Sequence, residues 1–147
     1  MKKIVMFGVV VMLLAGGIVS SSSAAEAEIV LVGHERIEDP LTQEEIQQIF
    51  LGKKTRWKDN TKIVFVIFNQ EDAYKTFLKQ YVQKTYSQYL NYWKKQVFTG
   101  KGRMPQMFND PQQLMVFLAN TEGAISFARV QDVTVPNMVK VIPVLPK

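Results

Sequence analysis

An α/β fold, with a mixed sheet covered by helices, is the fold class that the sequence predicts. Short runs of β-branched and aromatic residues, which are typical of buried strands, alternate with stretches whose apolar residues recur at helical spacing. Turn residues and helix-capping patterns separate the two kinds of segment. Because strands and helices alternate without an internal repeat, we expect one sheet with helices packed on it.

The N-terminal residues have the order of a secretory signal peptide. Two lysines follow the first methionine, residues 4–19 form an apolar run without charge, and residues 20–25 are all small. The apolar run is shorter than the stretch of about twenty residues that a membrane span needs. We therefore expect residues 1–25 to be a cleaved signal peptide and residues 26–147 to be the mature domain.

The composition is that of one ordinary exported domain. Removing 25 of the 147 residues leaves 122, which is enough to bury one core. The net charge of +5 falls to +3 without the two signal-peptide lysines, a mild excess that does not indicate nucleic acid as a partner. The chain has no cysteine, so packing rather than disulfides must stabilise it.

The first half of the mature chain predicts two strands with a helix between them. Residues 28–33 read EIVLVG, a β-branched run closed by glycine. Thr42 and Glu45 have the spacing of a capping box, which begins a helix that we expect to end at Phe50. Residues 62–68 (KIVFVIF) are the strongest strand signal in the chain. This run is apolar on both faces, so we expect it to lie centrally in the sheet.

The second half predicts three helices and two strands. Asn69 is the expected N-cap of a helix with an apolar stripe, and a second helix covers residues 87–97. Asp110-Pro111 begins a third helix that reaches residue 119, with proline in its first turn. Short strands are expected after Gly123 and over residues 139–144. The apolar stripe of the first helix consists of Tyr74, Phe77, Leu78, Tyr81 and Val82.

A basic loop over residues 53–60 surrounds Trp57. Its cations are Lys53, Lys54, Arg56 and Lys58. One interpretation is a basic patch for an acidic partner, an anionic lipid or a phosphate-bearing glycan. The other is a solvated loop in which Trp57 is a structural anchor, because a ring of this size stabilises the fold only when it leaves water. We expect Trp57 to be buried and to fold the loop back onto the helix that ends at Phe50.

Three segments together resemble the second lobe of phosphate ABC-transporter substrate-binding proteins. They are residues 49–57 (IFLGKKTRW), 98–102 (FTGKG) and 120–127 (NTEGAISF), and the similarity extends from about residue 29 to residue 130. The resemblance is closer still to the short, single-lobe proteins of this type. It implies one lobe of a type II periplasmic-binding-protein fold, a periplasmic location and a role in solute binding.

The resemblance also implies where an oxyanion would be held. In full-length relatives an arginine and a serine-glycine-threonine turn, at the start of the helix after the central strand, hold the ligand between two lobes. On this chain the arginine position falls on Ile67 or Phe68, and the turn falls on Asn69, Gln70, Glu71 and Asp72. Asn69 and Gln70 are candidate ligand-binding residues. The two carboxylates that follow them repel an anion from the helix N-terminus, so we expect weak phosphate binding or none.

A second candidate ligand site lies in the glycine loop. Thr99, Lys101 and Arg103 alternate with Gly100 and Gly102. Exposed N–H groups of such a loop form an anion-binding concavity. The alternative is a flexible connector that needs glycine for positive φ.

No catalytic constellation can be assembled from the sequence. His34 is the only histidine, and one histidine without cysteine makes neither a conventional zinc site nor a Ser-His-Asp or Cys-His arrangement. We expect His34 to be a polar surface residue, and we predict no enzyme activity, cofactor or metal. Tyr86, Tyr89 and Trp93 have the spacing of a core stripe. Five carboxylates crowd one segment, and capping and solubility explain them better than a metal site does. They are Glu35, Glu38, Asp39, Glu44 and Glu45.

These observations favour a non-catalytic, periplasmic, solute-binding-like protein that acts as a ligand-binding or accessory module. Its ligand would be an oxyanion or another small molecule, and its partner an envelope protein or an ABC transporter. The alternative is a structural or protein-interaction domain that has lost the ligand site. Neither hypothesis includes nucleic acid or a stable membrane span after signal removal.

Overall fold

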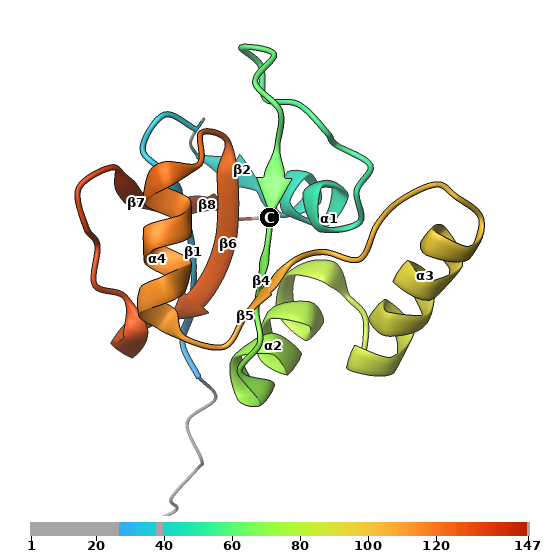
Figure 1. Cartoon of the computed structure of the whole chain (residues 1–147). Helices are drawn as coiled ribbons and strands as arrows, with labels where there is room; N and C mark the ends of the chain where they lie inside the picture. The colour runs from blue at the N-terminus through green and yellow to red at the C-terminus, as the bar shows by residue number, and fades with distance from the viewer. Residues whose placement is uncertain (1–26, 38–39, 147) are drawn as a thin grey trace, which may run out of the picture.

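The computed structural model describes residues 27–37 and 40–146, so the expected signal peptide lies outside the described residues (Figure 1). Its main sheet has four strands in the order β3-β6-β1-β7. The strands are β1 (Ile29–His34), β3 (Val64–Phe65), β6 (Ala124–Arg129) and β7 (Val139–Ile142). β1 is antiparallel to both of its neighbours, whereas β3 is parallel to β6. The sheet is therefore mixed, as the sequence predicts.

Helices cover this sheet, also as predicted. Within the described residues they are α1 (Gln43–Phe50), α2 (Glu71–Phe77), the π-helical η1 (Leu78–Val82), α3 (Tyr86–Phe98), α4 (Pro111–Asn120) and the 3₁₀ turn η2 (Val130–Asp132). α1 has the predicted capping box, and Asp110 caps α4 through the backbone N–H groups of Gln112 and Gln113. α3 begins with a second capping box, between Thr85 and Gln88. In Figure 1, α3 lies at the margin of the molecule.

The core is built around four phenylalanines. The ring of Phe127 on β6 stacks on Phe77 of α2 with 3.9 Å between centroids, and Phe50 of α1 meets Phe77 edge-on at 4.6 Å. Phe65 of β3 lies 5.4 Å from Phe50. These contacts join α1, α2 and the sheet into one hydrophobic cluster. Such aromatic pairs add stabilisation beyond the apolar area that they bury.

The strongest strand signal does not become one central strand. Residues 62–68 form two short strands, β3 and β4 (Ile67–Phe68), and β3 is an edge strand of the main sheet. The N–H groups of Val64 and Val66 donate to Gly123, just before β6, and to Ile125 within it. That of Ile67 donates to Gln106, just before β5 (Met107–Phe108). The run therefore has a neighbour on each edge, but over different residues. It is apolar on both faces because side chains of both faces are in the core or pack against it.

Proline also divides the last predicted strand. Residues 139–142 form β7, and after Pro143 the chain continues as β8 (Val144–Leu145), which pairs with β2 (Leu41–Thr42). Proline has no N–H group to donate to a ladder, so one continuous strand cannot run through residue 143.

The prediction that Asn69 caps α2 is wrong. Gln70 is the N-cap residue, and its side chain accepts no hydrogen bond from the helix start. The Asp72 carboxylate accepts from the backbone N–H of Ala73, at 2.8 Å. The Asn69 amide instead donates to the side-chain oxygen of Asn109, at 2.9 Å. A tertiary partner has replaced the local capping contact that the sequence pattern favours.

The expected burial of Trp57 is confirmed, since 4% of the residue is exposed. Its indole N–H donates to the carbonyl of Gly123, at 3.1 Å, in the turn before β6. Lys54 ties the same loop to α1 through Glu45, at 3.0 Å. The loop is thus anchored both to the sheet and to the helix that ends at Phe50.

None of the helices in the described part of the chain combines the length and apolar character needed to cross a bilayer.

Candidate functional site

Two parallel strands, β4 and β5, end side by side and lead into α2 and α4. Asn69 follows β4 and Asn109 follows β5, and their side chains are hydrogen-bonded to each other. The side-chain amide of Gln70 donates to the backbone carbonyl of Asn109, at 2.8 Å. Carboxyl ends of parallel strands are where α/β sheets usually bind ligands. We call this place the strand-end site.

An arginine from β6 completes the strand-end site. The Nε of Arg129 lies 2.5 Å from a carboxylate oxygen of Asp132, and one of its terminal nitrogens lies 3.3 Å from Asp72. The hydrogen bond that Arg129 donates to Asp132 raises the pKa of Arg129 above its ordinary value. The cation is thus held by two carboxylates of this chain, so an incoming anion would have to displace them.

Sequence reasoning missed Arg129, although it is the cation that joins β6 to the start of α2 at this place. The only local signal for it is the three-residue spacing from Asp132, which is common in turns. Its second partner, Asp72, lies 57 residues away in sequence. Such a contact follows from the topology of the fold and leaves no local pattern.

The start of α2 adds more negative charge to the strand-end site. Glu71 and Asp72 both lie in its first turn. The hydrogen bond that Lys75 donates lowers the pKa of Glu71 below its ordinary value. Carboxylates therefore lie around the position that the resemblance assigns to an oxyanion.

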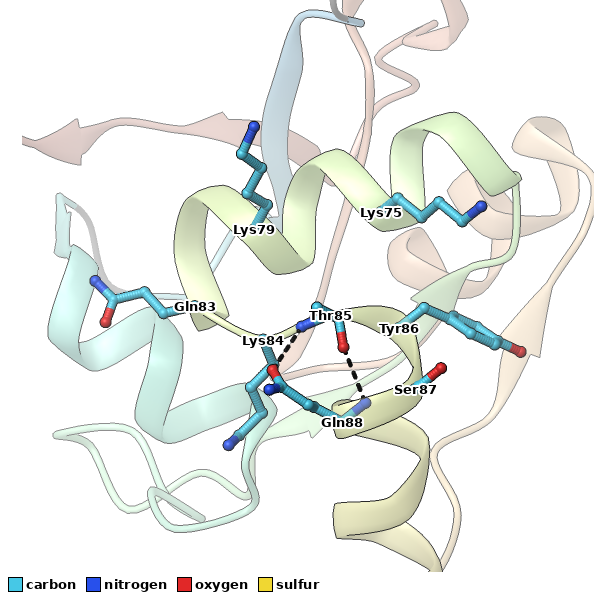
Figure 2. Close-up of a pocket in the computed structure, with 8 residues that line it drawn as sticks. All are labelled: Lys75, Lys79, Gln83, Lys84, Thr85, Tyr86, Ser87 and Gln88. Carbon is cyan, nitrogen blue, oxygen red and sulfur yellow. Dashed lines mark hydrogen bonds between the residues drawn. The ribbon is translucent and has the colours of Figure 1, made fainter.

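A groove of about 720 Å³ runs between α2–η1 and the beginning of α3 (Figure 2). We call it the α2–α3 groove. Its lining residues are Lys75, Lys79, Gln83, Lys84, Thr85, Tyr86, Ser87 and Gln88. A smaller pocket of about 400 Å³ shares Lys75 and Tyr86 with it and is also lined by Asn69 and Glu71, so the groove extends to the strand-end site, where a carboxylate lines it.

The groove is basic and has a rigid floor. Its lining contains three lysines and no carboxylate. The Thr85 backbone N–H donates to the Gln88 side chain at 3.0 Å, and the Gln88 backbone N–H donates to the Thr85 hydroxyl at 3.2 Å, which fixes the first turn of α3. Of the lysines, Lys75 pairs with Glu71 at 2.5 Å and Lys84 lies over the ring of Tyr92.

The three ammonium groups do not converge on one point. Figure 2 shows Lys75, Lys79 and Lys84 pointing in different directions around the rim. A compact anion therefore cannot contact all three in these side-chain conformations. Tyr86, expected in the core stripe, is 41% exposed and lines this groove, while Tyr89 and Trp93 are buried as predicted.

The candidates of the glycine loop lie elsewhere. Thr99 is the C-cap residue of α3, whereas Tyr86, which shares a pocket with Asn69, is its first residue. The thirteen residues of α3 separate these two places by almost 20 Å. The structure therefore brings Asn69 and Gln70 together but does not bring them near Thr99, Lys101 and Arg103.

The helix end uses the amide groups that were expected to form an anion-binding concavity. The backbone N–H groups of Thr99, Gly100 and Lys101 donate to carbonyls of α3, and the Thr99 hydroxyl donates to the Lys95 carbonyl at 2.8 Å. Helix C-termini carry a partial negative charge, which disfavours anions. The cations of Lys101 and Arg103 remain exposed there.

His34 is not the surface residue that we expected. It is 4% exposed, and its Nδ1 accepts a hydrogen bond from the backbone N–H of Arg36 at 3.2 Å. As the last residue of β1 it lies in the central strand of the sheet, which buries it. Of the predicted carboxylate cluster, Glu38 and Asp39 lie outside the described residues. Among the residues that are described, no group of three or more metal-ligating side chains has gathered.

Comparison with known proteins identifies the fold. It is that of phosphate ABC-transporter substrate-binding proteins. Similar structures are an ABC-type phosphate transport receptor from Vibrio cholerae (TM-score 0.52, 16% identity), a phosphate ABC transporter substrate-binding protein with bound phosphate from Clostridium perfringens (0.59, 20%) and PstS from Borrelia burgdorferi (0.58, 13%).

These alignments cover 80%, 80% and 82% of this chain but only 46%, 45% and 49% of the three proteins. The chain thus spans about half of their length, and the expected fold class is confirmed. No protein-family model matches the sequence, and no curated protein matches it significantly in sequence.

Proposed function

We propose that this chain is a non-catalytic binding module of the cell envelope that takes an anionic ligand larger than orthophosphate. The ligand lies along the α2–α3 groove. The observation that carries the proposal is the groove's lining, which holds three lysines and no carboxylate in a volume of about 720 Å³. The three lysines are spread around the rim of the groove, so a ligand whose anionic groups are also spaced apart matches them better than a single compact anion does.

The proposal departs from the ligand of the similar structures. The proteins from Vibrio cholerae and Clostridium perfringens are phosphate-transport proteins, and the second of them has phosphate bound. In this chain the strand-end site holds Glu71, and Asp72 together with Asp132 engages Arg129. Orthophosphate would meet two carboxylates at a helix start and a cation that is already paired, so its affinity should be low.

The signal-peptide pattern supports export, and it supports a periplasmic partner such as an ABC transporter or another envelope protein. The chain has about half the length of the transport proteins that it resembles, so their mechanism of closing two lobes is not assumed. Asn69 lies in the smaller pocket at the end of the groove, which Glu71 also lines, so we assign it a contact with an uncharged part of the ligand and not with an anionic group.

Calorimetric titration of residues 27–147 at physiological salt tests the proposal. All members of the described hydrophobic core lie between Ile29 and Ile142, so this segment contains the whole core. We expect a dissociation constant for orthophosphate no tighter than about 1 mM, and a value for tripolyphosphate at least about tenfold tighter. The double variant Lys75→Gln/Lys84→Gln should abolish the tripolyphosphate signal, while Lys53→Gln/Arg56→Gln, in the basic loop, should leave it unchanged.

Other outcomes assign the site differently. Micromolar binding of orthophosphate that is lost in Lys101→Gln would put the site on the glycine loop and contradict the proposal. Micromolar binding that survives Lys101→Gln and the groove variant would put it at the strand ends. Absence of binding for both anions would favour the alternative, a structural or protein-interaction domain, which the internal pairing of Arg129 already suits.

A further inference from the structure

The end of α3 and the loop after it, residues 94–104, project three apolar side chains into water. Phe98 is 92% exposed, and Val97 and Met104 are 45% and 42% exposed. We call this segment the α3 tip. Covering a phenylalanine that is almost wholly in water lowers the free energy, so such a residue often marks a contact surface.

Cations surround this apolar point. Lys94, Lys95, Lys101 and Arg103 all lie in the α3 tip and are all exposed. No aspartate or glutamate occurs in the sequence from residue 73 to residue 109. Among the described residues, no ion pair includes any of these four side chains.

The α3 tip has a built conformation. The Gly100 N–H donates to the Val97 carbonyl at 3.1 Å, and the Lys101 N–H donates to the Gln96 carbonyl at 2.9 Å, so the turn folds back on the helix. Gly102 then packs on the buried Trp93, where a Cβ would lie 3.1 Å from the indole ring. The backbone on both sides of Phe98 is therefore fixed, and its ring is held outward.

We propose that the α3 tip docks on an anionic phospholipid surface. Phe98, with Val97 and Met104 beside it, enters the boundary between headgroups and acyl chains, and the four cations contact the lipid phosphates. Binding to a membrane surface has two sources of affinity. Apolar side chains insert into the bilayer, and lysine and arginine bind the anionic headgroups. The four cations complement the charge of the proposed surface.

The shape of the patch favours a bilayer over a protein partner. A stable protein interface buries about 800 Å² on each side, and charged residues are depleted at its centre. Within residues 94–104, the α3 tip carries three exposed apolar side chains and four exposed cations. A headgroup layer accepts such a point, because phosphates lie at the level of the cations and acyl chains lie beneath.

Co-sedimentation of residues 27–147 with vesicles tests this inference. We expect binding to phosphatidylcholine vesicles that contain phosphatidylglycerol, little binding to phosphatidylcholine alone, and weakening by salt. Phe98→Ser should reduce the fraction bound severalfold, and Lys101→Gln/Arg103→Gln should do the same. Both changes are at exposed positions, so an unchanged melting temperature should show that the variants are folded.

Matched controls remove equivalent groups elsewhere. Val116→Ser removes a 60% exposed valine from α4, and Lys53→Gln/Arg56→Gln removes two cations from the basic loop. Neither should alter vesicle binding. In the variant Phe98→Trp, the new indole should shift its emission to shorter wavelength with anionic vesicles only.

Three results would overturn the inference. The first is no binding of the unaltered protein to anionic vesicles, and the second is vesicle binding that Phe98→Ser leaves intact. The third is concentration-dependent self-association, seen by sedimentation velocity without lipid and lost in Phe98→Ser, which would make the α3 tip a contact between copies of the protein. Each readout is separate from the tripolyphosphate titration, so the two proposals fail independently.

Discussion

Trp57 and Trp93 are equally buried but differ in the hydrogen bonding of their indole N–H groups. Both are 4% exposed. Trp57 donates its indole N–H to the carbonyl of Gly123, whereas the indole nitrogen of Trp93 is buried beside the Tyr89 side chain without a hydrogen bond of good geometry among the residues described. An unsatisfied buried donor costs about 1–3 kcal/mol. The two side chains bury the same ring but differ in that one bond.

Replacing each tryptophan by phenylalanine should therefore have unequal effects. Trp57→Phe removes packing and a hydrogen bond, while Trp93→Phe removes packing and an unpaired donor. We expect Trp57→Phe to lower the free energy of unfolding by about 1 kcal/mol more than Trp93→Phe, as measured by urea titration. Equal losses would show that the hydrogen bond to Gly123 contributes nothing net.

Glu45 links the capping box of α1 to the basic loop. Its carboxylate accepts from the Thr42 backbone N–H at 2.9 Å and pairs with Lys54 at 3.0 Å. Burial by itself would raise the pKa of Glu45, but these two partners outweigh it and the pKa is lowered. A carboxyl whose pKa is lower in the folded protein stabilises the fold above its unfolded-state pKa, and this contribution is lost as the pH falls through the folded-state value.

We accordingly expect Glu45→Ala to lower the free energy of unfolding by about 1 kcal/mol at neutral pH, the usual cost of losing a capping contact. The difference from the unaltered protein should shrink on acidification below the ordinary glutamate pKa. Denaturant titrations at several pH values measure it, with Glu44→Ala as the matched control on the exposed neighbour. A difference that stays constant with pH would contradict the assigned role of the charge.

At the scale of elements, the turn before β6 is the point where the sheet and the basic loop meet. The carbonyl of Gly123 accepts from Val64 in β3 and from Trp57. Its φ is +78°, and a Cβ on it would lie 2.2 Å from the carbonyl oxygen of Lys62. Glycine is needed there for conformation and for space together.

Gly100 offers a matched comparison, since its φ is +70° but a Cβ on it would have no neighbour within 4 Å. Gly100→Ala should cost about 1–2 kcal/mol from backbone conformation alone. Gly123→Ala should cost clearly more, because the backbone of residue 62 has to move and the bonds to Val64 and Trp57 weaken. Thermal unfolding of both variants measures the difference, and equal melting temperatures would refute the close approach.

The elements that the sequence predicts well are those whose signals are local. The capping box of Thr42 and the Asp110-Pro111 start each lie within one helical turn, and both are found in place. The position of residues 62–68 depends on which strands pair with them, and that is decided by segments some forty to sixty residues away. The split of this run between β6 and β5 therefore had no local signature.

For the whole molecule, the same distinction applies to the site. The resemblance pointed to Asn69 and Gln70 as candidate residues. The ion pairs that make their surroundings unfavourable for an anion join Arg129 to Asp72 and Asp132 across the fold, and no local sequence pattern identifies them. Tyr86 had helical spacing with Tyr89 and Trp93, yet it lines the α2–α3 groove because α3 packs through only part of that stripe. Spacing defines a helix face, whereas the neighbouring elements decide how much of that face is covered.

The outer strand β7 has a consequence for how molecules of this protein meet one another. β7 is four residues long, Lys140 lies within it, and Pro136 and Pro143 stand on either side. An exposed strand edge is a template for pairing with another chain, and short length, lysine and proline are the features that limit it. An added strand would find few consecutive hydrogen-bonding groups before proline interrupts the ladder. Growth of ordered aggregates from this edge should therefore be slow, even in a crowded compartment.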